Sequence, residues 1–171
     1  MGAQQGGRKK ILVLDDEPNV VAYLETLLQD NGYDTVSAGD GIEGMKKARS
    51  EKPDLITLDI SMPAESGIRF YRELKEDPEL AGIPVVIVTA VTGYGYKPED
   101  FQKFISSRKH IAPPNGFIAK PIDRDELLQG VNRLLSCSES ADQESSGVEV
   151  AGTGPASRVW SVRRACSARA L

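Results

Sequence analysis

The 171-residue chain is poor in the residues that build disulfide and zinc sites, since it has two cysteines and one histidine. Both cysteines, Cys137 and Cys166, come late in the sequence, and two isolated thiols do not indicate a disulfide framework or a metal site. The sequence also lacks any apolar run close to the roughly 20 residues that span a bilayer. The first run, Ile11–Leu14, stops at Asp15. We therefore expect no signal peptide, no membrane segment and a cytoplasmic protein.

An excess of positive charge is also missing, because 21 basic and 25 acidic side chains give a net charge of −4. Strong contacts with nucleic-acid phosphates need clustered Lys and Arg, so this balance argues against a general nucleic-acid-binding protein. The hydrophobic share of 40% and the charged share of 27% are ordinary, which excludes a mostly disordered or membrane-embedded chain. The length fits one domain of about 100–200 residues, with residues to spare.

Short apolar runs rich in Val, Ile and Leu alternate with helical patterns along the chain. This alternation predicts a parallel sheet with helices on both faces, because parallel strands need long crossover connections. The second run is the most polar, so we expect it at an edge of the sheet. The runs are Ile11–Leu14, Thr35–Ala38, Leu55–Leu58, Val85–Val88 and Phe117–Ala119.

Signals for helix ends separate these runs. Proline in a first turn, glycine as a stop and Asp-x-x-Glu capping boxes predict where the helices begin and end. A fourth helix with long loops is expected between Val91 and Gly116. The signals are Pro18 and Gly32 for the first helix, Asp40 with Glu43 for the second, Ser66-Gly67 and Asp77-Pro78 for the third, and Asp123 with Glu126 for the last.

Charged and hydroxyl side chains follow the strong strands, and the carboxyl ends of parallel strands meet at one edge of a sheet. Grouped carboxylates repel one another unless a cation holds them, and oxygen ligands without Cys or His favour Mg²⁺. A lysine and a threonine hydroxyl opposite the metal would hold a phosphoryl group. This set suits the transfer of a phosphate to a carboxylate, with Asp59 as the acceptor because it stands alone at a strand end. The residues are Asp15-Asp16-Glu17, Asp59, Thr89-Ala90 and Lys120-Pro121, in strand order.

These residues belong to ordered motifs that resemble the receiver domain of two-component response regulators, over roughly Lys9 to Ser136. The resemblance implies an α/β fold with a doubly wound, five-stranded parallel sheet in the flavodoxin-like order 2-1-3-4-5 and five helices. The motifs are Leu-Val-Leu-Asp15-Asp16-Glu17-Pro18, Asp59-Ile-Ser-Met62-Pro63 with Gly67, Val-Thr89-Ala90, and Phe117-Ile-Ala-Lys120-Pro121.

The resemblance also implies a chemistry for the acidic residues. A sensor histidine kinase or a histidine phosphotransfer protein would pass a phosphoryl group from phosphohistidine to Asp59. Asp16, Asp59 and the backbone carbonyl of Ser61 would ligate Mg²⁺ directly, and Asp15 would help directly or through water.

The remaining motif residues are implied to form a switch. Lys120 would pair with the phosphoryl group, Ala90 would lie against it, and Thr89 would rotate to hydrogen-bond it. Phe117 matches the aromatic residue whose inward turn accompanies activation. The signal would leave through the face of the fourth helix, fifth strand and fifth helix to a downstream protein. The stretch from Thr89 to Lys120 is longer than the compact family pattern, so this output face is where we expect a departure.

Two other classes of protein share parts of this pattern. A haloacid-dehalogenase-like phosphatase also uses Mg²⁺ and a strand-end aspartate, but it would want an Asp-x-Asp pair where this chain has Asp15-Asp16. A flavin-binding electron carrier would share the fold. It would need a Ser/Thr/Gly-rich phosphate loop after the first strand, where these acids would repel the phosphate of the flavin.

The chain divides into three expected segments, which are a flexible N-terminus over 1–8, the receiver domain over 9–136 and a flexible tail over 137–171. The tail is rich in Ser, Gly and Glu and then in Arg, and it lacks the apolar helical stripes of a helix-turn-helix domain. We therefore expect a stand-alone regulator that acts through protein contacts, without direct DNA binding, and affects gene expression only indirectly. It would be a monomer or a phosphorylation-dependent dimer, and not an enzyme beyond catalysing its own phosphorylation and dephosphorylation.

Overall fold

A single parallel sheet forms the centre of the structure, a computed structural model that describes residues 7–63, 66–90 and 111–139. Its strands are β1 (Lys10–Leu14), β2 (Asp34–Ala38), β3 (Leu55–Leu58), β4 (Val85–Ala90) and β5 (Gly116–Lys120). They lie in the order β2-β1-β3-β4-β5, and every neighbouring pair is parallel. All five predicted strands are confirmed, as is the strand order that the resemblance implied.

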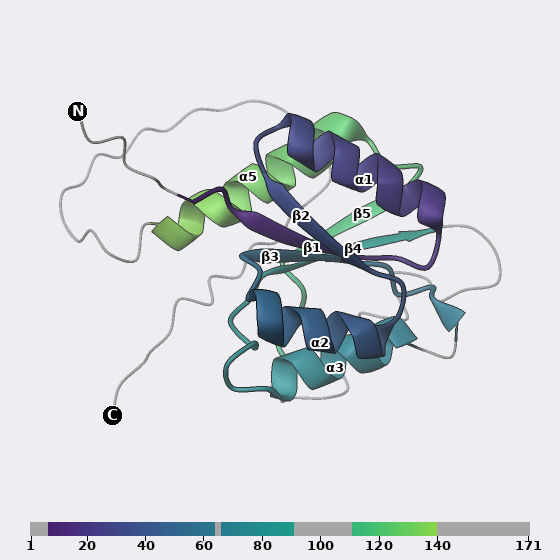
Figure 1. Ribbon diagram of the computed structural model, residues 1–171, viewed down its shortest axis with the longest axis vertical. Coiled ribbons are helices and arrows are strands. Elements are labelled where there is room, and N and C mark those ends of the chain that lie inside the picture. Colours follow the sequence, from purple (N-terminus) through teal and green to yellow (C-terminus); the bar gives the residue numbers. More distant parts are fainter. Residues whose placement is uncertain (1–6, 64–65, 91–110, 140–171) are drawn as a thin grey trace, which may run out of the picture.

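Helices cover both faces of the sheet. In the described part of the chain they are α1 (Pro18–Asp30), α2 (Gly41–Glu51), α3 (Ser66–Glu76) and α5 (Arg124–Glu139). Figure 1 shows α1 and α5 on one face and α2 and α3 on the other, which confirms the doubly wound α/β class. The predicted fourth helix falls within 91–110, which lies outside the described residues, as does most of the predicted tail. None of the helices in the described ranges combines the length and apolar character that crossing a membrane requires.

The predicted helix boundaries are set by local hydrogen bonds. Asp40 accepts a hydrogen bond from the N–H of Glu43 at 2.8 Å at the start of α2, and Asp123 accepts one from the N–H of Glu126 at 2.8 Å at the start of α5. Each carboxylate thereby satisfies an N–H group that the first helical turn would leave free. At the other end of α1, Gly32 adopts a φ of +87°, which glycine tolerates without strain.

Each face of the sheet has its own hydrophobic core, because neighbouring residues of a strand point to opposite faces. In β1, Ile11 and Val13 pack under α1 and α5, whereas Leu12 and Leu14 pack under α2 and α3. These four side chains are at most 1% exposed, as expected for a central strand. β2 buries only Ala38 completely, which confirms the predicted edge strand. The two cores hold the central strands in place and so position the residues that follow them.

One polar side chain interrupts the core within β3. Thr57 is 1% exposed, and its register partners are Val13 of β1 and Val86 of β4. Its hydroxyl has no hydrogen-bond partner among the residues that the structure describes. A buried hydroxyl without a partner lowers the free energy of unfolding, so Thr57 is a weak point of this strand.

Candidate functional site

The carboxyl edge of the sheet gathers the predicted acidic, hydroxyl and lysine side chains. Asp15 directly follows β1, Asp59 directly follows β3, Thr89 is the penultimate residue of β4, and Lys120 ends β5. Asp15, Asp59 and Thr89 are 2%, 3% and 1% exposed, respectively. Polar groups with so little exposure are uncommon in proteins unless they are paired or functional.

Lys120 connects the acidic residues to one another. Its Nζ lies 2.8 Å from Oδ2 of Asp59, 2.9 Å from Oδ2 of Asp15 and 3.1 Å from Oε1 of Glu17. The side chain of Lys120 is 13% exposed, so these interactions are largely shielded from water. One ammonium group therefore faces three carboxylates, and the cluster keeps an excess of negative charge.

The pKa values reflect this balance of burial and charge. Burial raises the pKa of Asp15, and this effect outweighs the hydrogen bond from the N–H of Glu17 and the ion pair with Lys120, which both lower it. For Lys120, burial alone would lower the pKa, but its hydrogen bond to Asp59 and its charge interactions with Asp59 and Asp15 outweigh burial and raise it. The lysine is therefore held in its charged form, while Asp15 resists ionisation.

Tight turns fix one oxygen of each buried aspartate. The N–H of Glu17 donates to Oδ1 of Asp15 at 2.9 Å, and the N–H of Ser61 donates to Oδ1 of Asp59 at 2.7 Å. In both residues Oδ2 is the oxygen that faces Lys120. Among the described residues, Oδ2 of Asp15 accepts no hydrogen bond and has only this ion pair. The two Oδ2 atoms are thus the oxygens presented to a ligand.

Gly67 explains why the motif after Asp59 needs a glycine. A Cβ atom at Gly67 would lie 2.2 Å from the backbone oxygen of Asp59 and 2.8 Å from Cα of Ile60. Both neighbours are backbone atoms, which cannot move aside as a flexible side chain can. Only glycine lets α3 begin against the turn that carries Asp59 and Ser61, and Met62 after this turn is buried in the core under α2 and α3.

The predicted switch residues lie on β4 and β5. The hydroxyl of Thr89 lies 2.8 Å from that of Ser61, which joins the ends of β3 and β4. Ala90 is exposed and lies opposite Lys120 in the β4–β5 register. Phe117 is partly buried and packs against the core under α2 and α3. The structure thus brings Thr89 and Ala90 to the same edge as Lys120 and places Phe117 three residues before Lys120, near the start of β5.

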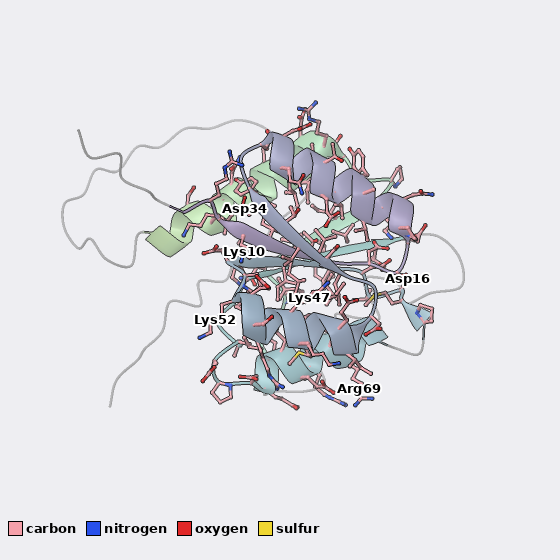
Figure 2. The ribbon with its side chains drawn as sticks, viewed as in Figure 1. Lys10, Asp16, Asp34, Lys47, Lys52 and Arg69 are labelled. Carbon is pink, nitrogen blue, oxygen red and sulfur yellow. The ribbon has the colours of Figure 1, made fainter. Side chains whose placement is uncertain are left out.

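Asp16 differs from its neighbour Asp15. It is exposed and lies outside the group of three carboxylates, although Figure 2 shows it at the same edge of the sheet, far from Lys10 and Asp34. Glu17 takes the third place in that group; it was expected among the acidic residues of this edge but not as a Mg²⁺ ligand. The signal for it was present, because Glu17 follows Asp15 by two residues in the turn that Pro18 then ends.

The donor set fits a hard divalent cation. Carboxylate oxygens of Asp15, Glu17 and Asp59 all lie within 4.8 Å of one another. Every donor is an oxygen, which suits Mg²⁺ rather than zinc, and Oδ2 of Asp15 is a buried acceptor without a hydrogen bond. The excess of negative charge at this edge also favours a cation.

Comparison with known proteins agrees with this geometry. PilH of Pseudomonas aeruginosa is 33% identical over 127 residues, which cover 74% of this chain and 98% of PilH. The alkaline phosphatase synthesis transcriptional regulatory protein PhoP of Bacillus subtilis is 36% identical over 133 residues, 78% of this chain. These residues span about half (51%) of PhoP.

A solved structure gives the same result for the fold. The chemotaxis protein CheY4 of Vibrio cholerae aligns with a TM-score of 0.63 and 25% identity, over 75% of this chain and 99% of CheY4. Residues 11–132 match the family described as the response regulator receiver domain, which confirms the resemblance. The chain therefore belongs to the response regulator receiver family, whose members are signalling modules of two-component systems.

Proposed function

We propose that this protein is a phosphoacceptor in which Asp59 receives a phosphoryl group from a phosphohistidine of a sensor histidine kinase or a histidine phosphotransfer protein. The observation that carries this proposal is the environment of Asp59. Its carboxylate is 3% exposed, the N–H of Ser61 holds Oδ1, and Oδ2 faces Lys120 at 2.8 Å. A carboxylate oriented in this way, beside a cation, is poised as a nucleophile.

The transfer would proceed at the oxygen that no backbone N–H holds, Oδ2 of Asp59. A new O–P bond forms as the N–P bond of phosphohistidine breaks, and the histidine nitrogen leaves with the electron pair. Lys120 then pairs with the negative oxygens of the transferred group, a role supported by its 2.8 Å distance from Asp59. Little covalent chemistry is left for the protein, so positioning and charge stabilisation provide the catalysis.

The same edge would hold Mg²⁺. We assign the ligands to Asp15, Asp16, Asp59 and the backbone carbonyl of Ser61, with Glu17 as an additional candidate because its carboxylate lies in the cluster. When bound, Mg²⁺ would neutralise charge on the phosphoryl oxygens and on the crowded carboxylates.

Signalling would follow from the new charge on Asp59. The phosphoryl group adds acceptor oxygens that Thr89 and Lys120 can approach, with Ala90 beside them, and the change would reach Phe117 through β5. The signal would leave through the face formed by the fourth helix, β5 and α5 to a downstream protein target.

We further propose a stand-alone regulator whose receiver domain begins near residue 9. Helix α5 continues to Glu139, so the domain boundary predicted at residue 136 lies three residues too early. The alignment with 98% of PilH supports a stand-alone organisation. Such a protein would act in the cytoplasm through protein contacts, without direct DNA binding. It would be a monomer or a phosphorylation-dependent dimer, and any enzymatic activity would be limited to its own phosphorylation and dephosphorylation.

Labelling with a small phosphodonor tests the proposed function. With acetyl phosphate and Mg²⁺, the full chain should form an acid-stable, alkali-labile adduct, and EDTA should prevent it. Asp59→Asn should abolish the adduct. Asp54→Asn, at the opposite end of β3, is the matched control and should label like the wild type. Unchanged labelling of Asp59→Asn would reject the assignment.

A further inference from the structure

Ser61 contacts two residues of the site. Its backbone N–H donates to Oδ1 of Asp59 at 2.7 Å, and its side-chain hydroxyl lies 2.8 Å from the hydroxyl of Thr89. Thr89 is 1% exposed, whereas Ser61 is exposed at the surface. In the described part of the chain, Ser61 is the side-chain partner of the Thr89 hydroxyl.

We infer that the Ser61 hydroxyl is a positioning group that stabilises the unphosphorylated state by satisfying the buried hydroxyl of Thr89. This inference rests on the proposed function, because it assigns Thr89 a different partner in each state. Without a phosphoryl group, Thr89 bonds to Ser61. With one, a phosphoryl oxygen takes the hydrogen bond that Thr89 donates, and the Ser61 hydroxyl turns to water, which its exposure allows.

The two states therefore depend unequally on Ser61. A buried hydroxyl that loses its partner is destabilised, so the loss of the Ser61 hydroxyl raises the free energy of the unphosphorylated state. The phosphorylated state does not lose a partner, because the phosphoryl oxygen remains. By linkage, a group that stabilises only the empty state lowers the affinity of the protein for the phosphoryl group.

The substitution Ser61→Ala should consequently strengthen the binding of a phosphoryl group. Removing one neutral hydrogen bond from the empty state corresponds to an increase in affinity of about 2- to 12-fold. Because Ser61 is exposed, the change leaves the core intact and keeps both the backbone N–H and the backbone carbonyl.

The test measures the affinity of the full chain for beryllofluoride, a phosphoryl-group analogue, by calorimetric titration in saturating Mg²⁺. Ser61→Ala should bind about 2- to 12-fold more tightly than the wild type. Ser61→Thr keeps a hydroxyl and should not show this gain in affinity. In a Thr89→Ala background, Ser61→Ala should have no effect, because the hydroxyl that it deprives of a partner is already absent.

The possible results separate this inference from the proposed function. If the wild type binds beryllofluoride and Ser61→Ala binds equally or more weakly, only the role of Ser61 is wrong. The same holds if Ser61→Ala strengthens binding equally in the Thr89→Ala background, since the gain would then not pass through Thr89. If the wild type binds no beryllofluoride, both the proposed function and this inference fail.

Discussion

Charged side chains are paired differently at the two ends of the strands, which we call the amino edge and the carboxyl edge of the sheet. At the amino edge, basic and acidic side chains pair one to one: Lys9 with Asp54 at 3.4 Å, and Lys10 with Glu51 at 2.8 Å. All four side chains are 34–39% exposed. At the carboxyl edge, Lys120 faces three carboxylates at once in a largely buried site. Figure 2 shows Lys10 and Asp34 at the end of the sheet opposite to Asp16.

Strand β3 makes the contrast concrete, because an aspartate lies at each of its ends. Asp54 accepts hydrogen bonds from the backbone N–H of Lys10 and from Nζ of Lys9, and both contacts are partly open to water. Asp59 is buried beside another carboxylate. Exposed, balanced pairs contribute little to stability, whereas buried charges of one sign oppose it. The excess of buried negative charge at the carboxyl edge therefore lowers the free energy of unfolding, and a bound cation would restore it. Such local destabilisation is typical of functional sites.

The largest expected effect comes from removing Lys120, the basic group that the described residues place against Asp15, Glu17 and Asp59. Lys120→Met should lower the free energy of unfolding by about 3 kcal/mol in metal-free buffer at pH 7, because it leaves buried carboxylates without a counter-charge. Added Mg²⁺ should restore part of the loss. Urea denaturation with and without Mg²⁺ measures both values.

Lys10→Met is the matched control at the amino edge. Its ion pair is exposed, so its urea midpoint should match that of the wild type, and Mg²⁺ should have no larger effect on it. Equal losses for the two variants would contradict the distinction between the edges.

A smaller effect is expected from Asp15→Asn. Burial raises the pKa of Asp15 above its usual value of 3.8, so the protonated carboxyl stabilises the folded state fully below pH 3.8. This stabilisation is lost as the pH rises through the raised pKa. Asparagine cannot ionise, so the Asp15→Asn variant does not lose this stability as the pH rises. At pH 7 without metal, the variant should be more stable than the wild type by on the order of 1 kcal/mol.

The pH dependence distinguishes this cause from a general gain in packing. The advantage of Asp15→Asn should grow from about pH 3.5, below the usual aspartate pKa, to neutrality, as followed by urea midpoints at successive pH values. Saturating Mg²⁺ should reduce it, because the cation binds the ionised Asp15 of the wild type more strongly than a neutral asparagine. An advantage that is constant with pH would show that charge at this edge does not lower stability.

The smallest effect is expected inside β3, between the two edges. Thr57→Val replaces a buried hydroxyl without a partner by a methyl group of similar size, so it should raise the free energy of unfolding by about 1 kcal/mol. Thermal unfolding measures the change. Thr57→Ser keeps the hydroxyl and loses a methyl group, so it should be less stable than the wild type. A destabilised Thr57→Val would mean that the hydroxyl is satisfied in solution.

The sheet could be predicted from the sequence because each strand is a short apolar run bounded by recognisable helix ends. Runs such as Val85–Val88 must be buried on both faces, and their parallel arrangement places the following residues at one edge. The meeting of Asp15, Asp59 and Lys120 followed from this rule together with the family motifs.

Details of side-chain direction could not be predicted in this way. Adjacent residues at a strand end turn to different sides, so Asp15 is buried and Asp16 is exposed, although the sequence shows two equivalent aspartates. The approach of Glu17 to Lys120 depends on the turn before α1. The contact between Ser61 and Thr89 joins residues 28 positions apart and depends on the exact ends of two strands.

The central claim is that the carboxyl edge accepts a phosphoryl group at Asp59. The most direct test is to treat the full chain with acetyl phosphate and Mg²⁺, reduce any acyl phosphate with borohydride, and locate the resulting homoserine by peptide mass spectrometry. We predict homoserine at position 59, with Asp15, Asp16 and Asp54 unmodified. Homoserine at one of those aspartates, or at none, in a fully folded sample would contradict the account.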